Sequence, residues 1–397
     1  MHRYKTYING EWFEGTSGIV LRSVDPSNNK ELGEIVQNSK EDVEYAIESA
    51  SRSFYKTREW RDLDVQQRSD KLLKIADMIE SEIDEIAKTE SMDNGKPLRE
   101  AQADVDDAVH CFRYYAGLIR TPSGQTYNVN SNFGNMHSYT VKEPVGVCAL
   151  ITPWNFPFLM SVWKIAPALA AGNSIIFKPS SETVLSALKL FEILDKCDLP
   201  KGTANLVIGS GSTVGNLLAE SKKVDMITFT GSTSVGQGIM RAAAGNVKKI
   251  GLELGGKSPN IVFADTDIDK TVEWVMMGIF LNQGEVCCAG SRLIIEKSIK
   301  DKFLKKLVER TDKLTLGAPL DNPDMGPLIS KKHMQDVLGY IEKGKAEGAK
   351  LLCGGYKCTD DDLVNGNFIK PAIFDDCTSD MSIVREEIFG PVLTVLT

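Results

Sequence analysis

The pattern of hydrophobic and polar positions divides the chain into a helical first part and a longer part in which strands and helices alternate. Apolar residues recur at helical spacing over residues 43–54 and again over residues 72–86. The segment Asn94-Gly95-Lys96-Pro97 then interrupts this pattern, because Gly and Pro break regular structure. A third amphipathic stretch covers about residues 98–118. The first third of the chain is therefore expected to be helical.

Residues 122–143 differ from the segments on either side. Ser, Asn, Gly and Thr dominate, and hydrophobic and polar side chains alternate over residues 138–142. We expect an exposed hairpin or arm here, with a plain surface loop as the simpler alternative.

From residue 145 onward, short apolar runs alternate with helical patterns. The expected strands are residues 145–151, 174–177, 204–208, 225–229 and 249–254, with a helix after each of the first four. Such alternation predicts a parallel sheet that is covered on both faces and built from right-handed crossovers. A second α/β series begins at residue 259, and the final apolar run, 391–397, is typical of a β-strand. The expected fold class is α/β, with two successive α/β units.

Composition and charge argue against several classes of protein. The net charge of −8 disfavours nucleic acid or an anionic membrane as the main partner. The most apolar window, residues 156–171, is interrupted by Lys164 and two prolines and is too short for a membrane span. Eight irregularly spaced cysteines without a C-x-x-C pair, and only four histidines, argue against a disulfide framework and a zinc site. We expect no metal, and the expected compartment is the reducing cytoplasm.

Three segments are candidates for a nucleotide site. Residues 209–215 form a Gly-rich turn, but the spacing G-x-G-x-x-x-G is one residue longer than the dinucleotide fingerprint, which favours a structural turn. Residues 229–236 place glycine and serine at an expected helix start, which favours an anion, with plain N-capping as the simpler explanation. Lys178, followed by Ser181 and Glu182, lies at the carboxyl end of an expected strand, where open α/β sheets bind ligands. Together they favour a nucleotide site.

A cysteine pair and a lone acid are the candidates for catalysis. Cys287 and Cys288 are flanked by glycine and small residues, which suits a loop where a thiol meets a substrate. Most cysteines are only small buried hydrophobes, and a nucleophilic thiol needs a lowered pKa or a nearby cation. Glu253 stands at the end of an apolar strand, before two glycines. A buried acid there would be costly unless paired or functional, which makes Glu253 a candidate general base.

Six segments, in this order and at this spacing, resemble the aldehyde dehydrogenase superfamily, and most closely its betaine-aldehyde-dehydrogenase-type members. They are residues 151–157, the Lys178 segment, 229–236, 253–259, 284–292 and 386–391. The resemblance covers essentially the whole chain. It implies a Rossmann-like NAD(P)-binding domain from residues 1–121 and 144–255, an oligomerisation arm at 122–143, and an α/β catalytic domain at 256–397. Because relatives continue for roughly one more α/β layer, the catalytic domain is expected to be incomplete, truncated at the C-terminus.

The resemblance also implies roles for single residues. Cys287 matches the nucleophile, Glu253 the general base, and Asn155 the side-chain donor of the oxyanion hole, which the Cys287 backbone N–H completes. The positions that match the cofactor site are Thr152, Pro153, Trp154, Lys178, Ser181, Glu182, Gly211, Phe229, Gly231, Ser232, Leu254, Gly255, Glu387 and Phe389. The positions that match the substrate site are Phe156, Met160, Trp163, Val286 and Cys288. Helix packing is the alternative for the first three of these.

The implied activity is oxidation of a small aldehyde, such as betaine aldehyde, to a carboxylic acid through a thiohemiacetal and a thioester that water hydrolyses. NAD is the expected cofactor and NADP the alternative, because the family's ribose-binding acid usually stands where this chain has Ser181, one place before Glu182. The resemblance further implies a homo-dimer or homo-tetramer. Two alternatives are a catalytically impaired or structural fragment of such an enzyme and a CoA-acylating semialdehyde dehydrogenase, which generally lacks the base.

Overall fold

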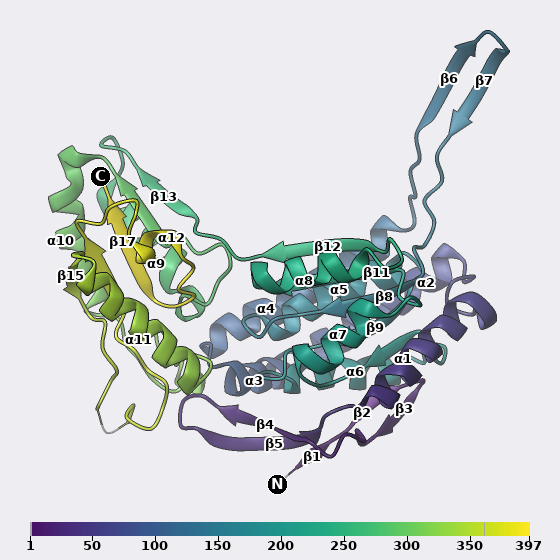
Figure 1. Cartoon of the computed structure of the whole chain (residues 1–397), viewed down its shortest axis with the longest axis horizontal. Helices are drawn as coiled ribbons and strands as arrows, with labels where there is room; N and C mark the ends of the chain where they lie inside the picture. The colour runs from purple at the N-terminus through teal and green to yellow at the C-terminus, as the bar shows by residue number, and fades with distance from the viewer. Residues whose placement is uncertain (1, 361) are drawn as a thin grey trace.

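The computed structural model describes residues 2–360 and 362–397 and shows two lobes with a projecting hairpin (Figure 1). The larger lobe holds the chain as far as β12 (Lys249–Leu254), and the smaller lobe holds the part from β13 (Pro259–Val262) onward. Within the described residues, no helix is both long enough and apolar enough to cross a membrane.

The larger lobe is built on a seven-stranded sheet with the order β12-β11-β8-β9-β10-β2-β3. Besides β12, its parallel strands are β8 (Val147–Ile151), β9 (Ser174–Lys178), β10 (Ala204–Leu206) and β11 (Met226–Gly231). Two antiparallel strands, β2 (Thr6–Ile8) and β3 (Glu11–Phe13), extend the sheet at one edge. The five parallel strands are those that the sequence pattern predicts.

Helices cover both faces of this sheet. One core contains residues of α2 (Val65–Ser81), α3 (Ile83–Asn94), α4 (Leu98–Leu118), α5 (Pro157–Ala170) and α6 (Leu185–Lys196). The other contains residues of α1 (Lys40–Arg52), α7 (Asn216–Glu220) and α8 (Thr233–Ala243). In β8, Cys148 and Leu150 pack into the first core, and Val147 and Ala149 into the second. Burial on both faces explains why β8 is a continuous apolar run.

The expectation of a helical first third is wrong for the first 36 residues. There β1 (Arg3–Tyr4), β4 (Val20–Asp25) and β5 (Lys30–Val36) form a separate three-stranded sheet, and β2 and β3 join the main sheet. These strands are short or carry many exposed polar side chains, so no apolar run marks them in the sequence. The stretch 72–86 is also two helices rather than one, because α2 ends at Ser81 and α3 begins at Ile83.

The polar segment after α4 forms an antiparallel hairpin of β6 (Thr126–Ser131) and β7 (Gly134–Tyr139). It projects away from the larger lobe (Figure 1), and Phe133 at its turn is 96% exposed. The prediction of an exposed hairpin is confirmed, while its role in assembly stays a prediction.

The smaller lobe contains a five-stranded sheet with the order β13-β14-β17-β16-β15. β13, β14 (Arg292–Ile295), β17 (Val392–Leu396) and β16 (Ala372–Asp375) are parallel, and β15 (Lys350–Cys353) is antiparallel at the edge. One core contains residues of α9 (Ile268–Phe280) and α10 (Lys300–Thr311), and the other residues of α11 (Lys331–Ala346) and α12 (Ser382–Arg385). The final apolar run is thus a strand, as predicted, and it lies in the centre of this sheet.

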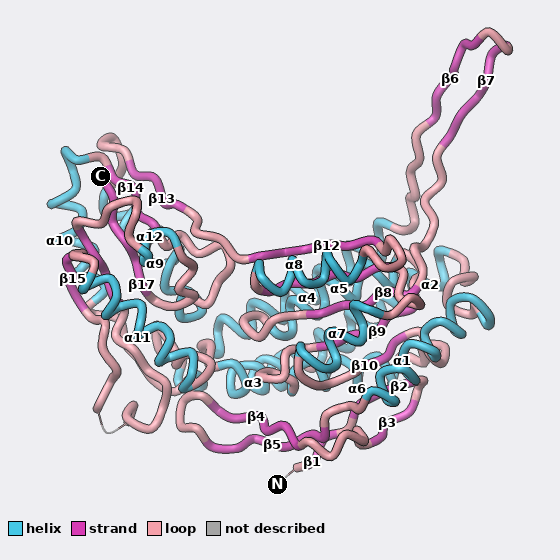
Figure 2. Tube along the Cα trace, viewed as in Figure 1, coloured by secondary structure: helices cyan, strands magenta, loops and turns pink. Residues whose placement is uncertain are grey.

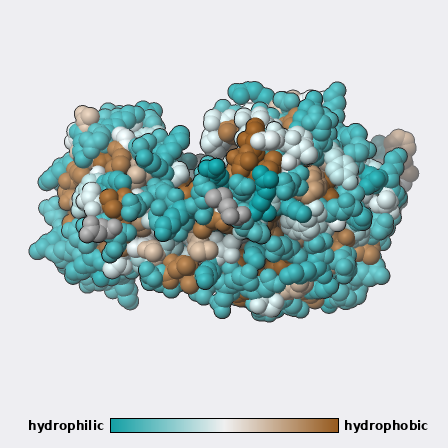
Figure 3. Space-filling view, turned by 90° about the horizontal axis from the view of Figure 1, so that it is seen from below, coloured by the Kyte–Doolittle hydropathy of each residue, from teal (hydrophilic) through white to brown (hydrophobic). Residues whose placement is uncertain are grey.

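A short segment joins the lobes. The chain leaves β12 at Leu254 and enters β13 at Pro259, and Figure 2 shows this crossing as a loop between two strands. On the face seen in Figure 3 the surface is mostly hydrophilic, and a notch lies between the lobes. Glu253 stands immediately before the crossing, so one of the candidate catalytic residues lies where the two lobes meet.

Candidate active site

The loop that carries Cys287 begins with an unusual backbone. After α9 the chain enters a helical turn (Leu281–Gly284) in which Asn282 and Gln283 have φ of 45° and 58°. Gly284 follows with φ of 75°, and a Cβ there would lie 2.4 Å from the Gly390 carbonyl oxygen. Three successive residues in the left-handed region reverse the chain sharply, and at the third of them only glycine fits. The reversal places Cys287 in a half-buried position before β14.

Asn155 is held against this loop. It lies between β8 and α5 and is 2% exposed. Its side-chain Nδ2 donates to the backbone carbonyl oxygen of Glu285 at 2.8 Å. The backbone carbonyl oxygen of Asn155 accepts from Asn282 Nδ2 at 2.7 Å. The side-chain amide has two N–H donors, so one fixes the orientation and the other is available to a ligand. Because Glu285 lies two residues before Cys287, this contact holds the amide against the cysteine loop, which suits an oxyanion-hole donor.

Cys287 and Glu253 line one cavity of about 560 Å³ in the described part of the chain. Met160 and Trp163 from α5 line it as well, together with Lys164, Thr228 and Thr230. Three further residues assigned to the substrate site lie elsewhere: Phe156 has its ring 4.1 Å from Lys96 Nζ, Val286 lines a small pocket with Glu387, and Cys288 is exposed.

The expectation that Glu253 is buried is wrong. The residue is exposed, because β12 is the edge strand of the seven-stranded sheet and has a strand on one side only. Next to it in the cavity, Lys164 Nζ donates to Thr228 Oγ1 at 3.0 Å. Burial lowers the pKa of Lys164 to about 8, although the charge of Glu253 opposes this shift. A solvent-accessible carboxylate in the same cavity as the cysteine is placed to contact water.

The thiol of Cys287 is not acidified by its surroundings. Burial raises its pKa above the ordinary value, and the neighbouring Cys288 and Glu387 raise it further. A nearby cation, which a reactive thiol commonly uses, is not among these groups. The attacking thiolate must therefore form by proton loss to a base.

The residues assigned to the adenosine end of the cofactor site lie at the carboxyl ends of β9, β10 and β11. Lys178 ends β9, and its Nζ donates to the Pro179 carbonyl oxygen at 2.8 Å. Burial lowers the pKa of Lys178 to about 8. Ser181 and Glu182 follow in the loop before α6, and Gly211 opens the turn Gly211–Gly215 after β10.

Ser232 caps α8 by accepting from the Val235 N–H. Phe229 and Gly231 are close, since a Cβ on Gly231 would lie 2.4 Å from Phe229 Cζ. The capped start of α8 directs N–H groups and a positive dipole end toward the carboxyl edge of the sheet, which suits a pyrophosphate. Capping and anion binding use different N–H groups, so the two interpretations of Ser232 are compatible.

The nicotinamide end of the predicted site joins the two lobes. The Gly256 N–H donates to Glu387 Oε1 at 3.3 Å. A Cβ on Gly255 would lie 1.8 Å from Glu387 Oε2, so only glycine at this position leaves room for the carboxylate. Burial raises the pKa of Glu387. Leu254 precedes these glycines at the end of β12 and packs against the second core of the larger lobe.

Phe389 has φ of 59°, in the left-handed region, and its carbonyl oxygen lies 2.7 Å from His333 Nε2. Its ring meets Trp154 edge-on at 5.2 Å. Trp154 itself belongs to the segment Thr152-Pro153-Trp154 that follows β8, where the Thr152 N–H donates to the Lys178 carbonyl oxygen at 3.2 Å. The two ends of the predicted cofactor site are thus connected through one loop.

The donors and acceptors of this surface fit a dinucleotide. A lysine at a strand end, a helix N-terminus, and a carboxylate over two glycines match what ribose hydroxyls and a pyrophosphate need. Thr152 Oγ1 and Lys257 Nζ are also buried without a hydrogen-bond partner among the described residues. Such groups are costly unless a ligand or water satisfies them.

Sequence reasoning missed several residues that hold the site. Asn282 contacts the backbone of Asn155, and His333 contacts the backbone of Phe389. Lys96 contacts the ring of Phe156, next to Asn155. His333 lies in an amphipathic helix, where a partly buried polar residue has no distinctive pattern. In the sequence, Lys96 stands in a segment that breaks the helical pattern. No local feature shows that its side chain is fully buried.

The sequence matches the model of the aldehyde dehydrogenase family over residues 12–397. The chain belongs to this family. A betaine aldehyde dehydrogenase of Bacillus subtilis (strain 168) is 47% identical over 392 residues, which are 98% of this chain and 79% of that protein. Aminoaldehyde dehydrogenase 1, peroxisomal, of Pisum sativum is 44% identical over 395 residues, or 98% of this chain and 78% of its own length.

Among solved structures, a betaine aldehyde dehydrogenase of Staphylococcus aureus in complex with NAD+ superimposes with a TM-score of 0.95 at 42% identity. The match covers 99% of this chain and 77% of that chain. The resemblance to aldehyde dehydrogenases and the α/β fold expected from it are confirmed. The roles of single residues are not tested by these similarities and stay predictions.

The raised pKa of Cys287 predicts how its alkylation depends on pH. Because the thiolate is the reactive form, alkylation by iodoacetamide should rise about tenfold per pH unit between about pH 6 and about pH 8.5, without a plateau. The rate would be followed by mass spectrometry of the peptide in a Cys288→Ser background, with Cys287→Ser as the control. A plateau near neutral pH would contradict the raised pKa.

Proposed function

We propose that this aldehyde dehydrogenase oxidises a small aldehyde to its carboxylic acid with NAD+, using Cys287 as nucleophile and Glu253 as general base. The observation that carries the proposal is that one cavity is lined by both residues while Asn155 is locked against the cysteine loop. A nucleophile, a water-accessible base and an oriented amide are what acyl transfer to water requires.

The first half of the mechanism uses the thiol. Cys287 loses its proton to solvent, and its sulfur then attacks the carbonyl carbon, forming a C–S bond and turning the carbonyl oxygen into a negatively charged oxygen. The free N–H of the Asn155 amide and the Cys287 backbone N–H stabilise this oxygen. Bound NAD+ supplies the hydride acceptor. With loss of hydride from carbon, the thiohemiacetal on Cys287 becomes a thioester.

The second half uses water. Glu253 removes a proton from a water molecule that attacks the thioester carbon, the C–S bond breaks, and the carboxylic acid leaves. Exposure of Glu253 in the shared cavity supports this role, because a base for hydrolysis must contact water. The same observation disfavours a CoA-acylating enzyme, in which no such base is needed.

Lys178, Ser232 and Glu387 are the residues we assign to cofactor binding at the adenosine ribose, the pyrophosphate and the nicotinamide ribose. NAD+ is the proposed cofactor, and the relative of known structure from Staphylococcus aureus binds NAD+. The carboxylate of Glu182 near Lys178 would repel the extra phosphate of NADP+. The free thiols of the chain suit a reducing compartment such as the cytoplasm.

Betaine aldehyde is the substrate that we propose within this class. Two relatives carry the names betaine aldehyde dehydrogenase and aminoaldehyde dehydrogenase, so both are named for aldehydes with a nitrogen group. In this chain Trp163 is half-exposed at the cavity. An indole face attracts a quaternary ammonium group, with a strength of about 0.5–2 kcal/mol.

We also propose that the hairpin β6–β7 joins subunits into a homo-dimer or homo-tetramer. An isolated two-stranded hairpin is marginally stable by itself in water. This one exposes Tyr127, Val129, Phe133, Met136 and Tyr139, an apolar surface typical of an interface.

Glu253→Gln should separate the two halves of the reaction. We expect one equivalent of NADH to form per site, followed by steady turnover at least about a hundredfold slower, because acylation does not need the base. Stopped-flow absorbance would record both phases. Cys287→Ala should give neither phase but retain NAD+ binding by calorimetry, and the exposed Glu309→Gln is the matched control. Unchanged steady turnover in Glu253→Gln would exclude this role.

Substrate preference can be tested with two aldehydes of the same shape. Betaine aldehyde should exceed the uncharged 3,3-dimethylbutanal in kcat/KM, and Trp163→Ala should reduce the advantage by about tenfold, the upper range of a cation–π contact. The assays would measure NADH or NADPH formation with each cofactor. Equal kcat/KM for both aldehydes would reject betaine aldehyde without affecting the dehydrogenase proposal.

Charges on the hairpin should prevent assembly. The pair Val129→Asp and Met136→Asp is expected to shift the sedimentation coefficient to that of a monomer, because buried unpaired charges are costly. Val364→Asp, which changes an exposed apolar residue outside the hairpin, should leave it unchanged. If the doubly substituted chain and the unaltered chain sediment alike, the arm has no role in assembly.

A further inference from the structure

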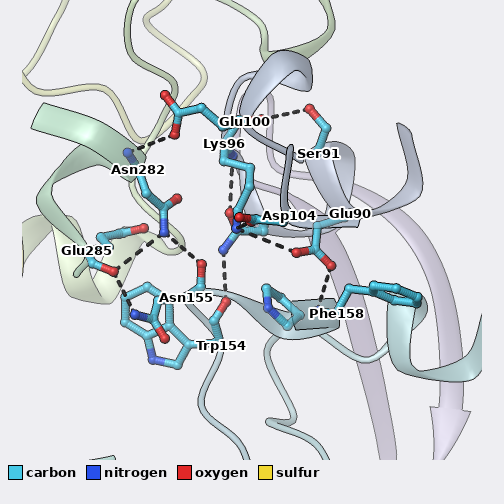
Figure 4. Close-up of polar contacts among 12 residues, drawn as sticks. Glu90, Ser91, Lys96, Glu100, Asp104, Trp154, Asn155, Phe158, Asn282 and Glu285 are labelled. Atoms are coloured by element: carbon cyan, nitrogen blue, oxygen red, sulfur yellow. Dashed lines mark hydrogen bonds and ion pairs between the residues drawn. The ribbon is translucent and has the colours of Figure 1, made fainter. Parts of the chain in front are cut away.

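A buried cluster of charged and polar side chains lies next to the loop of Asn155 (Figure 4). Its centre is Lys96, in the turn between α3 and α4, and Glu90, in α3, and both are fully buried. Neither residue has a part in the proposed reaction. Buried charges are expensive to desolvate, so a cluster of this kind next to an active site needs a physical explanation.

Two side chains from this region hold the backbone of the Asn155 loop. Asn94 Nδ2 donates to the Trp154 carbonyl oxygen at 2.8 Å. Glu90 Oε2 accepts from the Phe158 N–H at 2.9 Å. These contacts fix the residue before Asn155 and the first turn of α5 after it, as Figure 4 shows.

Asn282, from the loop of the smaller lobe that leads to Cys287, also holds the Asn155 loop. Its Nδ2 donates to the carbonyl oxygen of Asn155, and its own N–H donates to Glu100 Oε2 at 2.9 Å. Glu100 belongs to α4, the helix that begins after the turn. The cysteine loop and the Asn155 loop are therefore both tied to one turn and the helices that flank it.

Lys96 keeps the acceptors of this cluster in place. Its Nζ lies 2.5 Å from Asp104 Oδ2 and 3.5 Å from Glu90 Oε1, and 4.1 Å from the centre of the Phe156 ring. Burial lowers the pKa of Lys96, but the carboxylates of Asp104 and Glu90 outweigh burial and raise it. A charged lysine between two carboxylates and under Phe156 leaves the segment little freedom to move.

The preceding residue restricts the turn further. Gly95 has φ of 100°, and a Cβ there would lie 2.9 Å from the Pro327 carbonyl oxygen. The turn thus has a fixed conformation and a fixed contact with the smaller lobe. It is a rigid base rather than a flexible connection.

We infer that the turn Asn94-Gly95-Lys96, together with Glu90, is a positioning element for the oxyanion-hole amide of Asn155, with Asn94 as its most direct residue. An oxyanion donor acts only if it is held to within about half an ångström of its productive position. The inference rests on the proposed function of Asn155. It adds that residues about 60 positions earlier in the chain control the acylation step without touching the substrate.

The experiment is a double-mutant cycle between Asn94→Ala and Asn155→Ala. The rate of the first NADH turnover reports acylation. Asn94→Ala is expected to slow it about tenfold in the presence of Asn155 and less than about twofold in its absence, because the two substitutions act through one group. The KM for NAD+ and the rate of Cys287 alkylation should not change.

Tyr7→Phe is the matched control, because it removes another part-buried hydrogen bond of the larger lobe, from Tyr7 on β2 to Asp195 Oδ1 at 3.0 Å. It should lower the melting temperature without slowing acylation. If Asn94→Ala does not fold, Glu90→Gln takes its place in the cycle, because it removes the charge that faces Lys96. Equal losses with and without Asn155, or no loss at all, would overturn the inference.

Amide hydrogen exchange gives a readout that does not depend on activity. Residues 154–158 should exchange faster in Asn94→Ala and keep their protection in Tyr7→Phe. The unaltered enzyme and Asn155→Ala show whether the proposed function holds: turnover in the first and slow acylation in the second establish it. Unaltered exchange in Asn94→Ala would overturn the positioning role, whatever the turnover of the unaltered enzyme.

Discussion

The hydrogen bonds among Asn155, Asn282 and Glu285 are the interaction on which the rest of the site depends. They join the loop after β8, in the larger lobe, to the loop before β14, in the smaller lobe. All three residues are nearly fully buried, so their amides and carbonyl groups have no water to replace a lost partner. An unsatisfied buried polar group costs about 1–3 kcal/mol. Removing one partner while the others stay buried would leave such a group, and the hydrogen bonds therefore fix the cysteine loop and the amide relative to each other.

The electrostatics of Cys287 follow from the same closeness. Burial raises the pKa of its thiol, and no cation compensates among the groups that act on it. A neutral thiol is a poor nucleophile, but it is also less prone to oxidation and unwanted alkylation. In the proposed mechanism the thiol becomes reactive only when a base accepts its proton. Glu253 is exposed in the same cavity, and the proposed mechanism uses it only in the second half, where it activates water.

The sequence allowed much of the fold to be predicted, because the central parallel strands β8 and β9 are buried along their length and appear as apolar runs. The exposed hairpin was also predictable from its polar composition. The N-terminal strands were not, because they are short or polar and depend on pairings such as that of β2 with the distant strand β10. The exposure of Glu253 depends on the strand order of the sheet, which no local pattern contains.

The site shows the same division between local and distant information. Motifs place the cysteine and the amide on loops and the acid at a strand end, but they do not show how the loops are held. Asn94 and Trp154 are distant in sequence and meet only because α3 packs beside α5. In the sequence, the Gly and Pro of the segment Asn94–Pro97 are already explained by the break between two helices. Nothing in the segment therefore indicates the long-range contacts of Asn94 and Lys96.

The cost of the buried cluster supports a role in geometry rather than in stability. Burial raises the pKa of both Glu90 and Asp104, which means that the surroundings oppose their charged forms even with Lys96 between them. Well-packed apolar side chains in place of a buried ion pair are often as stable or more stable. An apolar core at this position could not accept the Phe158 N–H or bind the Trp154 carbonyl oxygen. The polar groups are therefore best explained by the fixed backbone that they impose on the loop of Asn155, because that constraint is the one property an apolar replacement would lose.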